Sequence, residues 1–308
     1  MTSPSTAPVD PVSADPNAER RAEIRQTTLA RLGRRKLTSR AAQVACVAAL
    51  VAVLVPLFAV IGYTIKRGIG AWSTGFFTHL PTPTGISGGG IHNAIIGTLI
   101  IDAMATIMVV PVGVGAALYL ARTDTRLAST LRFGADVLAG IPSIVIGIFA
   151  YTLLVVTLGH FSAISASFAL AVLMLPIIVR SSEIALRAVP KDLLEAGAAL
   201  GMRESTVMLR IALPFALPGV VTGVLLGVAR AAGETAPLLF TAIGSQYWSI
   251  SLTRPIAAMP LVIFLNGIQA YKDLQQIAWG TALALILMVL VINVGARVWT
   301  ARIRRSMR

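Results

Sequence analysis

Long apolar runs, separated by short segments rich in arginine, dominate the hydrophobic pattern of the chain. A helix needs about 20 apolar residues to cross the roughly 30 Å hydrocarbon core of a bilayer. Apolar runs of this length occupy residues 41–65, 91–121, 137–179, 211–243 and 274–296, and their only charged residues are Asp102 in the second run and Arg230 and Glu234 in the fourth. The third run is too long for one crossing, and a turn-like Gly-His-Phe-Ser sequence at 159–162 divides it into two. The pattern therefore predicts an all-α polytopic membrane protein with six transmembrane helices.

Two proline-containing segments interrupt this pattern. Residues 255–271 are uncharged, but they are short and contain Pro255 and Pro260. We therefore expect a folded-back or interfacial segment on the outer side there, and a seventh crossing is the alternative. The Gly-Ile-Pro-Ser sequence at 140–143 is expected to shape helix packing or to act as a hinge.

Composition agrees with the pattern. Hydrophobic residues make up 56% of the 308 residues and charged residues only 13%, far from the composition of a soluble globule. Cys46, which lies inside an apolar run, is the single cysteine of the sequence, and one cysteine cannot form a disulfide framework.

The positions of the basic residues predict the orientation. Eight lie between residues 20 and 40, three between 122 and 132, four between 187 and 210, and five between 297 and 308. The loops of the opposite side carry only Lys66, Arg67, Arg254 and Lys272. Because cytoplasmic loops are enriched in lysine and arginine, both termini are predicted to be cytoplasmic. The net charge of +13 then reflects topology and lipid contact, and we expect no nucleic-acid partner.

This topology divides the chain into four regions. Residues 1–36 are expected to form a mobile basic cytoplasmic tail with some helix near 18–32, and residues 37–66 the first transmembrane helix. Residues 91–300 form the main transmembrane domain, with a cytoplasmic loop at about 183–214. Residues 301–308 are a second basic tail.

The cytoplasmic loop contains the most informative sequence of the chain, residues 195–214. Small residues follow Glu195, Gly201 permits a turn after a short helix, and Pro214 opens the next crossing. Small residues allow a partner to approach a helix closely, and Glu195 offers that partner a carboxylate. The pattern of Glu195, Ala196, Gly197, Gly201 and a terminal Ile-x-Leu-Pro resembles the EAA loop of bacterial ABC importer permeases. Gly197 stands where that family usually has a second alanine.

The resemblance extends to the PstA-type permease subunits of phosphate-specific ABC importers. It rests on four segments, which are NAIIGTLI at 93–100, LPIIVRSSE at 175–183, VARAAGETAPLLFTAIGSQYW at 228–248 and RPIAAMP at 254–260. It covers the chain from about residue 91 to the end. It implies a type I ABC importer permease bundle in a bacterial inner or plasma membrane, which imports inorganic phosphate.

The same resemblance implies a hetero-oligomer. A second, PstC-like permease would complete the translocation path, and an external, PstS-like phosphate-binding protein would deliver the ion. A dimer of PstB-like ATPase subunits would bind the EAA loops through Glu195, Ala196, Gly197 and Gly201. ATP and magnesium would belong to that ATPase, so no cofactor is expected in this chain.

Charged residues within crossings are the candidates for an anion path, because an ionised group in a bilayer is costly unless it is paired or wet. Arg230 and Glu234 are four residues apart, which places them on one helix face. They form either a structural pair or a path element in which the arginine fork binds phosphate oxygens and Glu234 competes for it. Thr235 could add a hydroxyl donor, and Pro237 a kink. Arg180, close to Glu183, either snorkels to the headgroups or joins the exit route.

Enzymatic chemistry has no support in the sequence. None of the four lysines follows a glycine, so the chain has no Gly-Lys-Ser/Thr phosphate loop. The three histidines are scattered, no pair has metal-ligand spacing, and no Gly-x-Ser-x-Gly elbow occurs. Asp102 is interpreted as a structural acid that faces the bundle.

Four alternatives remain open at this point. A sulfate or molybdate ABC permease would share the architecture, whereas an ion-coupled secondary anion transporter would bind no ATPase. A membrane-embedded enzyme and a regulatory or structural membrane subunit are the others.

Overall fold

The computed structural model describes residues 18–83, 86 and 88–306. Regular structure in this part of the chain is helical, apart from one isolated bridge between Ile243 and Ile256. The chain divides into two units, Met1–Gly62 and Tyr63–Arg308. Residues 1–17 of the predicted mobile tail lie outside the described residues.

The described part of the first unit belongs to α1, Ala18–Gly68. This helix contains both the segment near 18–32 where helix is predicted and the first predicted crossing. Its apolar side chains are exposed, among them Val44, Val53 and Phe58, which are 69%, 69% and 66% accessible. Such a surface is stable in lipid but not in water, which supports a crossing within Thr38–Ala71.

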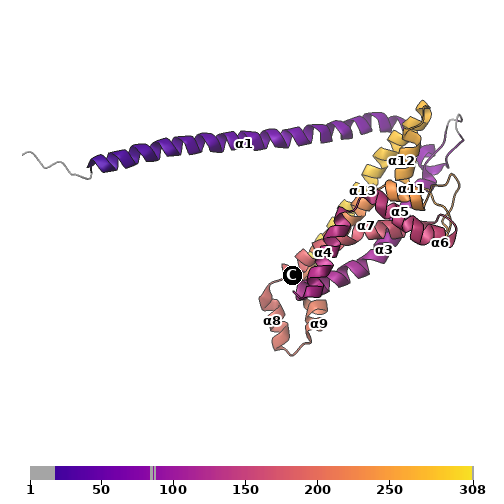
Figure 1. The fold of residues 1–308 in the computed structure, drawn as a ribbon. Coiled ribbons are helices and arrows are strands. Elements are labelled where there is room, and N and C mark those ends of the chain that lie inside the picture. The colour runs from indigo at the N-terminus through magenta and orange to yellow at the C-terminus, as the bar shows by residue number, and fades with distance from the viewer. Residues whose placement is uncertain (1–17, 84–85, 87, 307–308) are drawn as a thin grey trace, which may run out of the picture. The chain divides into compact units, whose positions relative to one another are not determined.

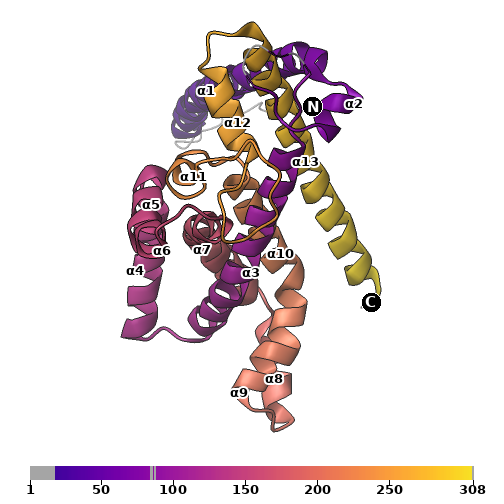
Figure 2. The same ribbon diagram turned by 90° about the vertical axis from the view of Figure 1, so that its right-hand side faces the viewer.

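The second unit is a helix bundle built around α7, Ala163–Arg187. Three long helices, α3 (His92–Arg122), α10 (Leu213–Ala231) and α13 (Lys272–Ser306), accompany α7 in the bundle (Figure 2). The main core is formed where α3 and α7 meet, around Ile101, Leu170 and Met174. The central position of α7 explains why its apolar stretch is mostly buried, whereas the stretches of the other crossings are mostly accessible.

A stripe of glycines brings α10 close to α7. Gly219, Gly223 and Gly227 recur every fourth residue, so they share one helix face. They face Ala185, Ser181 and Ile178, respectively. A Cβ atom added to Gly219 would lie 2.5 Å from the Cβ of Ala185. Membrane helices commonly associate through small residues in this way, because there is little hydrophobic force to drive them together.

We expect Gly223→Ala to destabilise the bundle by about 1–3 kcal/mol, as overpacking commonly does. The added methyl group would overlap the hydroxyl and Cβ of Ser181. Thermal unfolding of the purified chain in detergent measures the loss, and Ser181→Gly in the same chain should restore most of it. Gly115→Ala is the matched control, because nothing lies within 4 Å of a Cβ added there. Equal stability of Gly223→Ala and Gly115→Ala would contradict the packing.

The third predicted crossing is broken. Helix α4 (Arg126–Gly140) and the following helical segment (Ser143–Leu158) meet at an angle of 102°. That segment comprises α5 (Ser143–Ala150), a π-helical turn (Tyr151–Val155) and α6 (Val156–Leu158). The predicted break at 140–143 is confirmed, because Ile141 is extended and Pro142 has no N–H to continue the helix. The predicted turn at 159–162 is confirmed as well, with Gly159 at φ +76°.

The fifth predicted crossing, 211–243, is wrong at both ends. The helix begins earlier, as α9 (Glu204–Val207), continues through a π-helical turn (Met208–Ala212) and ends with α10 at Ala231. A turn containing Gly233 follows, and then the short α11, Ala236–Thr241. Apolar composition alone did not reveal this end, because residues 235–243 are apolar yet are used in a separate helix.

Among the described residues, five helices are long and apolar enough to cross a membrane, and the bent pair makes six. The predicted six crossings are therefore confirmed when the pair is counted as one. Helix α12, Met259–Gly267, has nine residues and is too short for a seventh. It packs beside α13.

The two ends of the second unit differ. Helix α8, Lys191–Ala199, and α9 lie at one end, and α2, Thr74–Thr78, lies with α12 at the opposite end (Figures 1 and 2). The 3₁₀ turn Ile69–Ala71 leads from α1 toward α2.

Candidate functional site

The α8–α9 loop is a helix, a tight turn and a second helix, as the sequence predicts. Helix α8 starts after Pro190, which cannot continue a preceding helix. It ends at Ala199, and Gly201 follows with a φ of +76°, a left-handed conformation that glycine adopts without a steric penalty. The N–H groups of Gly201 and Met202 donate to the carbonyls of Ala198 and Gly197 at 2.9 and 3.3 Å. These bonds satisfy carbonyls that the end of the helix would leave unpaired.

The four predicted coupling residues divide into two sets. Glu195, Ala196 and Gly201 are exposed, as a docking surface requires. Gly197 is buried instead, and a Cβ there would lie 2.6 Å from Cδ1 of Ile211 and 3.1 Å from Cγ2 of Val207. The glycine therefore allows α8 to pack against the start of the next crossing. This contact gives a structural reason why the sequence pattern combines a small residue at position 197 with isoleucine at position 211.

An ion pair connects the start of α9 to the end of α3. Arg122, in the last turn of α3, donates through Nε and Nη2 to both carboxylate oxygens of Glu204, in the first turn of α9. Such a forked pair fixes direction as well as distance. A cavity of about 380 Å³ lies beside this pair, between α8 and the ends of α3 and α7.

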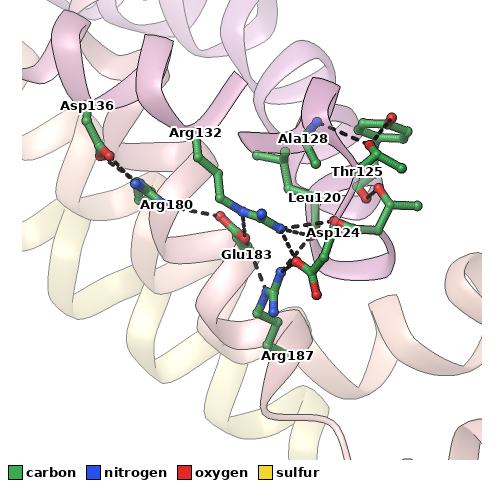
Figure 3. Close-up of polar contacts among 11 residues, drawn as sticks. Leu120, Asp124, Thr125, Ala128, Arg132, Asp136, Arg180, Glu183 and Arg187 are labelled. Carbon is green, nitrogen blue, oxygen red and sulfur yellow. Dashed lines mark hydrogen bonds and ion pairs between the residues drawn. The ribbon is translucent and has the colours of Figure 1, made fainter. Parts of the chain in front are cut away.

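A cluster of six charged residues joins α4 and α7 next to this loop (Figure 3). We call it the Glu183 cluster, and it consists of Asp124, Arg132, Asp136, Arg180, Glu183 and Arg187. Glu183 lies at its centre, with a side chain only 6% exposed. Its Oε1 accepts from Nε of Arg132 at 2.7 Å and from Nε of Arg187 at 3.2 Å, and its Oε2 from Nη1 of Arg180 at 3.4 Å.

Two outer carboxylates complete the cluster. Asp124 accepts from Nη2 of Arg132 at 3.0 Å and from Nη2 of Arg187 at 2.9 Å. Asp136 binds both Nε and Nη2 of Arg180. The guanidinium of Arg187, followed by that of Arg132, lowers the pKa of the Asp124 carboxyl below its usual value. Asp124 therefore stays ionised at neutral pH, and its bonds are lost only as the pH falls through that lowered pKa.

The arginines of the cluster also cap the C-terminal end of α3. The backbone carbonyl of Leu120 accepts from Nη2 of Arg132 at 2.7 Å and from Nη2 of Arg187 at 3.0 Å, and that of Thr123 accepts from Arg132 at 3.1 Å. Leu120 belongs to the last turn of α3, whose carbonyls have no partner within the helix. Arginines from α4 and α7 thus hold the end of α3.

Sequence reasoning missed this cluster, although a signal was present. Arg180, Glu183 and Arg187 recur at helical spacing on α7, and Arg132 and Asp136 recur at the same spacing on α4. The joining of these two faces, which lie about 50 residues apart in the sequence, could not be read from either helix alone.

Arg180 is placed in this cluster. Its guanidinium is engaged by Asp136 and Glu183. The position on α10 that is level with Arg180 is Gly223, because Gly223 faces Ser181. Arg230 lies seven residues after Gly223, so Arg180 and Arg230 are separated along the helix axis by about two turns, roughly 10 Å at 1.5 Å per residue. The structure does not bring the predicted path residues together in one group.

The other predicted path residues lie where α10 ends. Arg230 is in the last turn of α10, and its Nε lies 3.6 Å from Oε1 of Glu234. Glu234 belongs to the turn that follows, so the expectation that both share one helix is wrong, although they do pair. The side chain of Arg230 is 52% exposed and that of Glu234 is 20% exposed. Arg230 is therefore held on one side and open on the other.

Thr235 and Pro237 lie just beyond this pair. Thr235 precedes α11, and its side chain makes no capping bond to that helix. Pro237 lies in the first turn of α11, where proline is well tolerated, so it starts a helix instead of kinking one. A Cβ added to Gly147 of α5 would lie only 2.8 Å from Cα of Pro237. The region that follows Arg230 thus packs directly on the helix that extends from α4.

Asp102 is buried in α3, with 7% of its surface exposed. Among the described residues its Oδ2 has no hydrogen-bond partner. Its position agrees with the interpretation of an acid that faces the bundle. The described residues contain no group of histidine, cysteine and acidic side chains that could hold a metal ion.

Three of the segments that carry the family resemblance meet at the end opposite α8. Asn93 donates through Nδ2 to the carbonyl of Ser245 at 2.8 Å, and Thr98 Oγ1 accepts from the N–H of Met259 at 2.8 Å. A Cβ at Gly97 would overlap the carbonyl of Ala257. The segment 93–100 therefore contacts both 228–248 and 254–260, so three of the four segments that carry the resemblance lie together in the fold.

A multi-pass helical fold, an exposed helical loop between two crossings and an ion pair at the end of α10 are features of a membrane-embedded transport protein. Residues 109–308 match the family of binding-protein-dependent transport system inner membrane components. The chain belongs to this family.

Individual relatives agree with the family. The chain is 40% identical to the phosphate transport system permease protein PstA of Yersinia pestis, over 78% of this chain and 82% of the relative. It is 41% identical to the protein of the same name from Haemophilus influenzae, over 76% and 84%. Among solved structures, a chain of the MetNI methionine ABC transporter, described as inward-facing, matches with a TM-score of 0.58 at 20% identity, over 71% of this chain and 97% of that chain. That likeness concerns the fold alone.

Proposed function

We propose that this chain is the transmembrane permease subunit of an ATP-driven importer of inorganic phosphate. The observation that carries the proposal is the 40% identity to a phosphate transport system permease over most of both chains. The α8–α9 loop gives the proposal a physical basis, since it presents an exposed carboxylate and small residues at one end of the bundle. A subunit that receives force from a soluble ATPase needs such a surface.

The chain works in this proposal with several partners. ATP is hydrolysed by a separate ATPase dimer, to which ATP and magnesium bind, because this sequence has no phosphate loop. A second permease of similar design completes the path, and an external binding protein supplies phosphate. The protein thus acts as one subunit of a hetero-oligomer in a bacterial inner or plasma membrane, and it catalyses no reaction itself.

Orientation follows from charge. The end that carries α8 also carries Arg122, Arg126, Arg187, Lys191 and Arg203, and we place it in the cytoplasm together with both termini. Closure of the ATPase dimer then moves α8 and converts an outward-open path to an inward-open one.

Arg230 contributes to the path. Its guanidinium is half exposed and is balanced on one side by Glu234. A forked donor suits the oxygens of phosphate. The nearby carboxylate limits how tightly the arginine holds the anion, and a transport site must release its ion as well as bind it. Thr235 supports the same site with a hydroxyl.

Substrate choice is tested by uptake of labelled phosphate into cells that lack their own high-affinity phosphate importer and express the complete complex. The expected result is uptake that unlabelled phosphate suppresses and that equal sulfate or molybdate does not. Suppression by sulfate or molybdate would instead assign the chain to the importers of those oxyanions. Cells that express the complex without this chain are the control.

A further inference from the structure

The Glu183 cluster joins three parts of the bundle that the coupling loop must move together. Asp124 comes from the α3–α4 loop, Arg132 and Asp136 from α4, and the other three members from the last turns of α7. Helix α7 runs into α8 after only three residues, 188–190. The cluster therefore lies at the base of the proposed coupling loop, between it and the bundle.

Both helices of the coupling loop are connected to this base. Helix α8 follows α7 through a short connection in which Val189 is buried. Helix α9 is held by the pair of Glu204 with Arg122, and the same turn of α3 supplies the Leu120 carbonyl to Arg132 and Arg187. A displacement of α9 thus reaches α3 through the forked pair of Arg122 with Glu204, and a displacement of α8 reaches α7 through the short connection 188–190.

The charges in the cluster are balanced and fully used. Three arginines face three carboxylates, and Glu183 alone contacts all three arginines. A buried carboxylate is costly without cationic partners, so Glu183 favours the arrangement in which all three arginines contact it. Each arginine of the cluster also contacts a second carboxylate in this arrangement, Asp124 for Arg132 and Arg187 and Asp136 for Arg180.

A route from the cluster to the proposed path also exists. Arg132 and Asp136 lie on α4, which continues across the bend at Ile141 and Pro142 into α5. Gly147 of α5 lies against Pro237, just after the turn that holds Glu234. Elements with direct packing thus lead from the coupling loop to the end of α10.

We propose that Glu183 is a positioning residue for energy coupling. It locks the ends of α3, α4 and α7 into one block, so that movement of the α8–α9 loop is transmitted to the bundle and is not absorbed at the loop's own base. The inference rests on the proposed function, because it assigns Glu183 a role in the ATP-driven movement of that same permease.

The test measures phosphate transported per ATP hydrolysed in vesicles that contain the complete complex. Glu183→Gln keeps the size of the side chain but leaves three arginines facing two carboxylates. We expect ATP hydrolysis to continue while phosphate transported per ATP falls about tenfold, within the range that coupling between sites commonly spans. A normal ratio would overturn the proposal. Asp273→Asn is the matched control, since this exposed residue in the first turn of α13 lies outside the cluster and should keep the wild-type ratio.

A second variant separates transmission from charge balance. Arg132→Gln together with Glu183→Gln leaves two arginines and two carboxylates in the cluster, yet removes the central link between α4 and α7. We expect this protein to assemble and still to show the low ratio. Recovery of the normal ratio would mean that the cluster requires only neutrality, and would overturn the proposal.

A third variant is used if the first two do not assemble, and the wild-type complex tests the identity of the substrate. If neither variant assembles, Asp124→Asn decides, because this mostly exposed carboxylate bridges Arg132 and Arg187. We then expect a fall of about fivefold in the ratio, smaller than for Glu183, and an unchanged ratio would overturn the proposal. Transport by the wild-type complex separates a failure of the proposed phosphate function from a failure of the proposal about Glu183. If it transports another oxyanion, the phosphate assignment fails, and the ratio is measured with that ion.

Discussion

Replacement of Glu195 with lysine is expected to leave the chain inserted in the membrane while phosphate uptake falls by at least about tenfold and ATP hydrolysis continues. The side chain is exposed on α8, and within the described part of the chain no residue forms an ion pair with it. The variant should therefore fold normally. Its effect arises at the partner, because a reversed charge in an interface places like charges together and costs more than a lost contact.

Uptake and ATP hydrolysis in vesicles measure this uncoupling, and co-purification with the ATPase measures assembly. Asp273→Lys makes the same type of charge change on α13, away from the loop, and should behave as the wild type. Normal uptake by Glu195→Lys would show that the Glu195 carboxylate is not required for coupling.

Gly201 tests the shape of the same loop. Its left-handed conformation has open space around it, so the cost of Gly201→Val is backbone strain, roughly 1–2 kcal/mol, and not a clash. We expect that strain to turn α8 away from its docking position and to uncouple the complex. Gly201→Asn is the matched control, since asparagine tolerates this conformation. Normal uptake by both Gly201→Val and Glu195→Lys would refute the assignment of the loop.

Arg230→Gln is expected to reduce phosphate uptake to background while the complex still assembles. The arginine is half exposed at the end of α10, so its loss should disturb the fold little. Transport should suffer strongly, because glutamine keeps a polar side chain but provides neither the positive charge nor the guanidinium fork for the anion. Uptake of labelled phosphate by the assembled variant gives the result.

Two companion variants identify the reason for that loss. Arg230→Lys keeps the charge without the planar fork and should retain a small part of the uptake. Glu234→Gln should bind phosphate more tightly but release it more slowly, so that uptake falls at saturating phosphate. Normal uptake by Arg230→Gln would reduce the pair to a structural contact between the end of α10 and the turn that follows.

The apolar runs predicted most of the fold because length and charge decide membrane crossings. Residues 91–121 correspond closely to α3, His92–Arg122, and 274–296 fall inside α13. The main error lies where the backbone turns within a largely apolar stretch. Gly233 follows the end of α10 inside residues 211–243, which were predicted as one crossing, whereas the bend at Pro142 was predicted from the sequence.

The candidate site was predicted in part. Spacing within one segment was enough to place Glu195 and Ala196 on an exposed helix and Gly201 at its end, because these are local features. Gly197 was included with them, but its buried position against Ile211 depends on a partner fourteen residues later in the chain. The Glu183 cluster needed knowledge of how α4 packs on α7, which no single helix contains.

ATP-dependent uptake of labelled phosphate into vesicles tests the central claim most directly. The vesicles would contain this chain, the partner permease and the ATPase, with the external binding protein added. We predict uptake that requires ATP and every component, and that stops when this chain alone is left out. Phosphate uptake without ATP, driven by an ion gradient, or uptake that persists in the absence of this chain, would contradict the account.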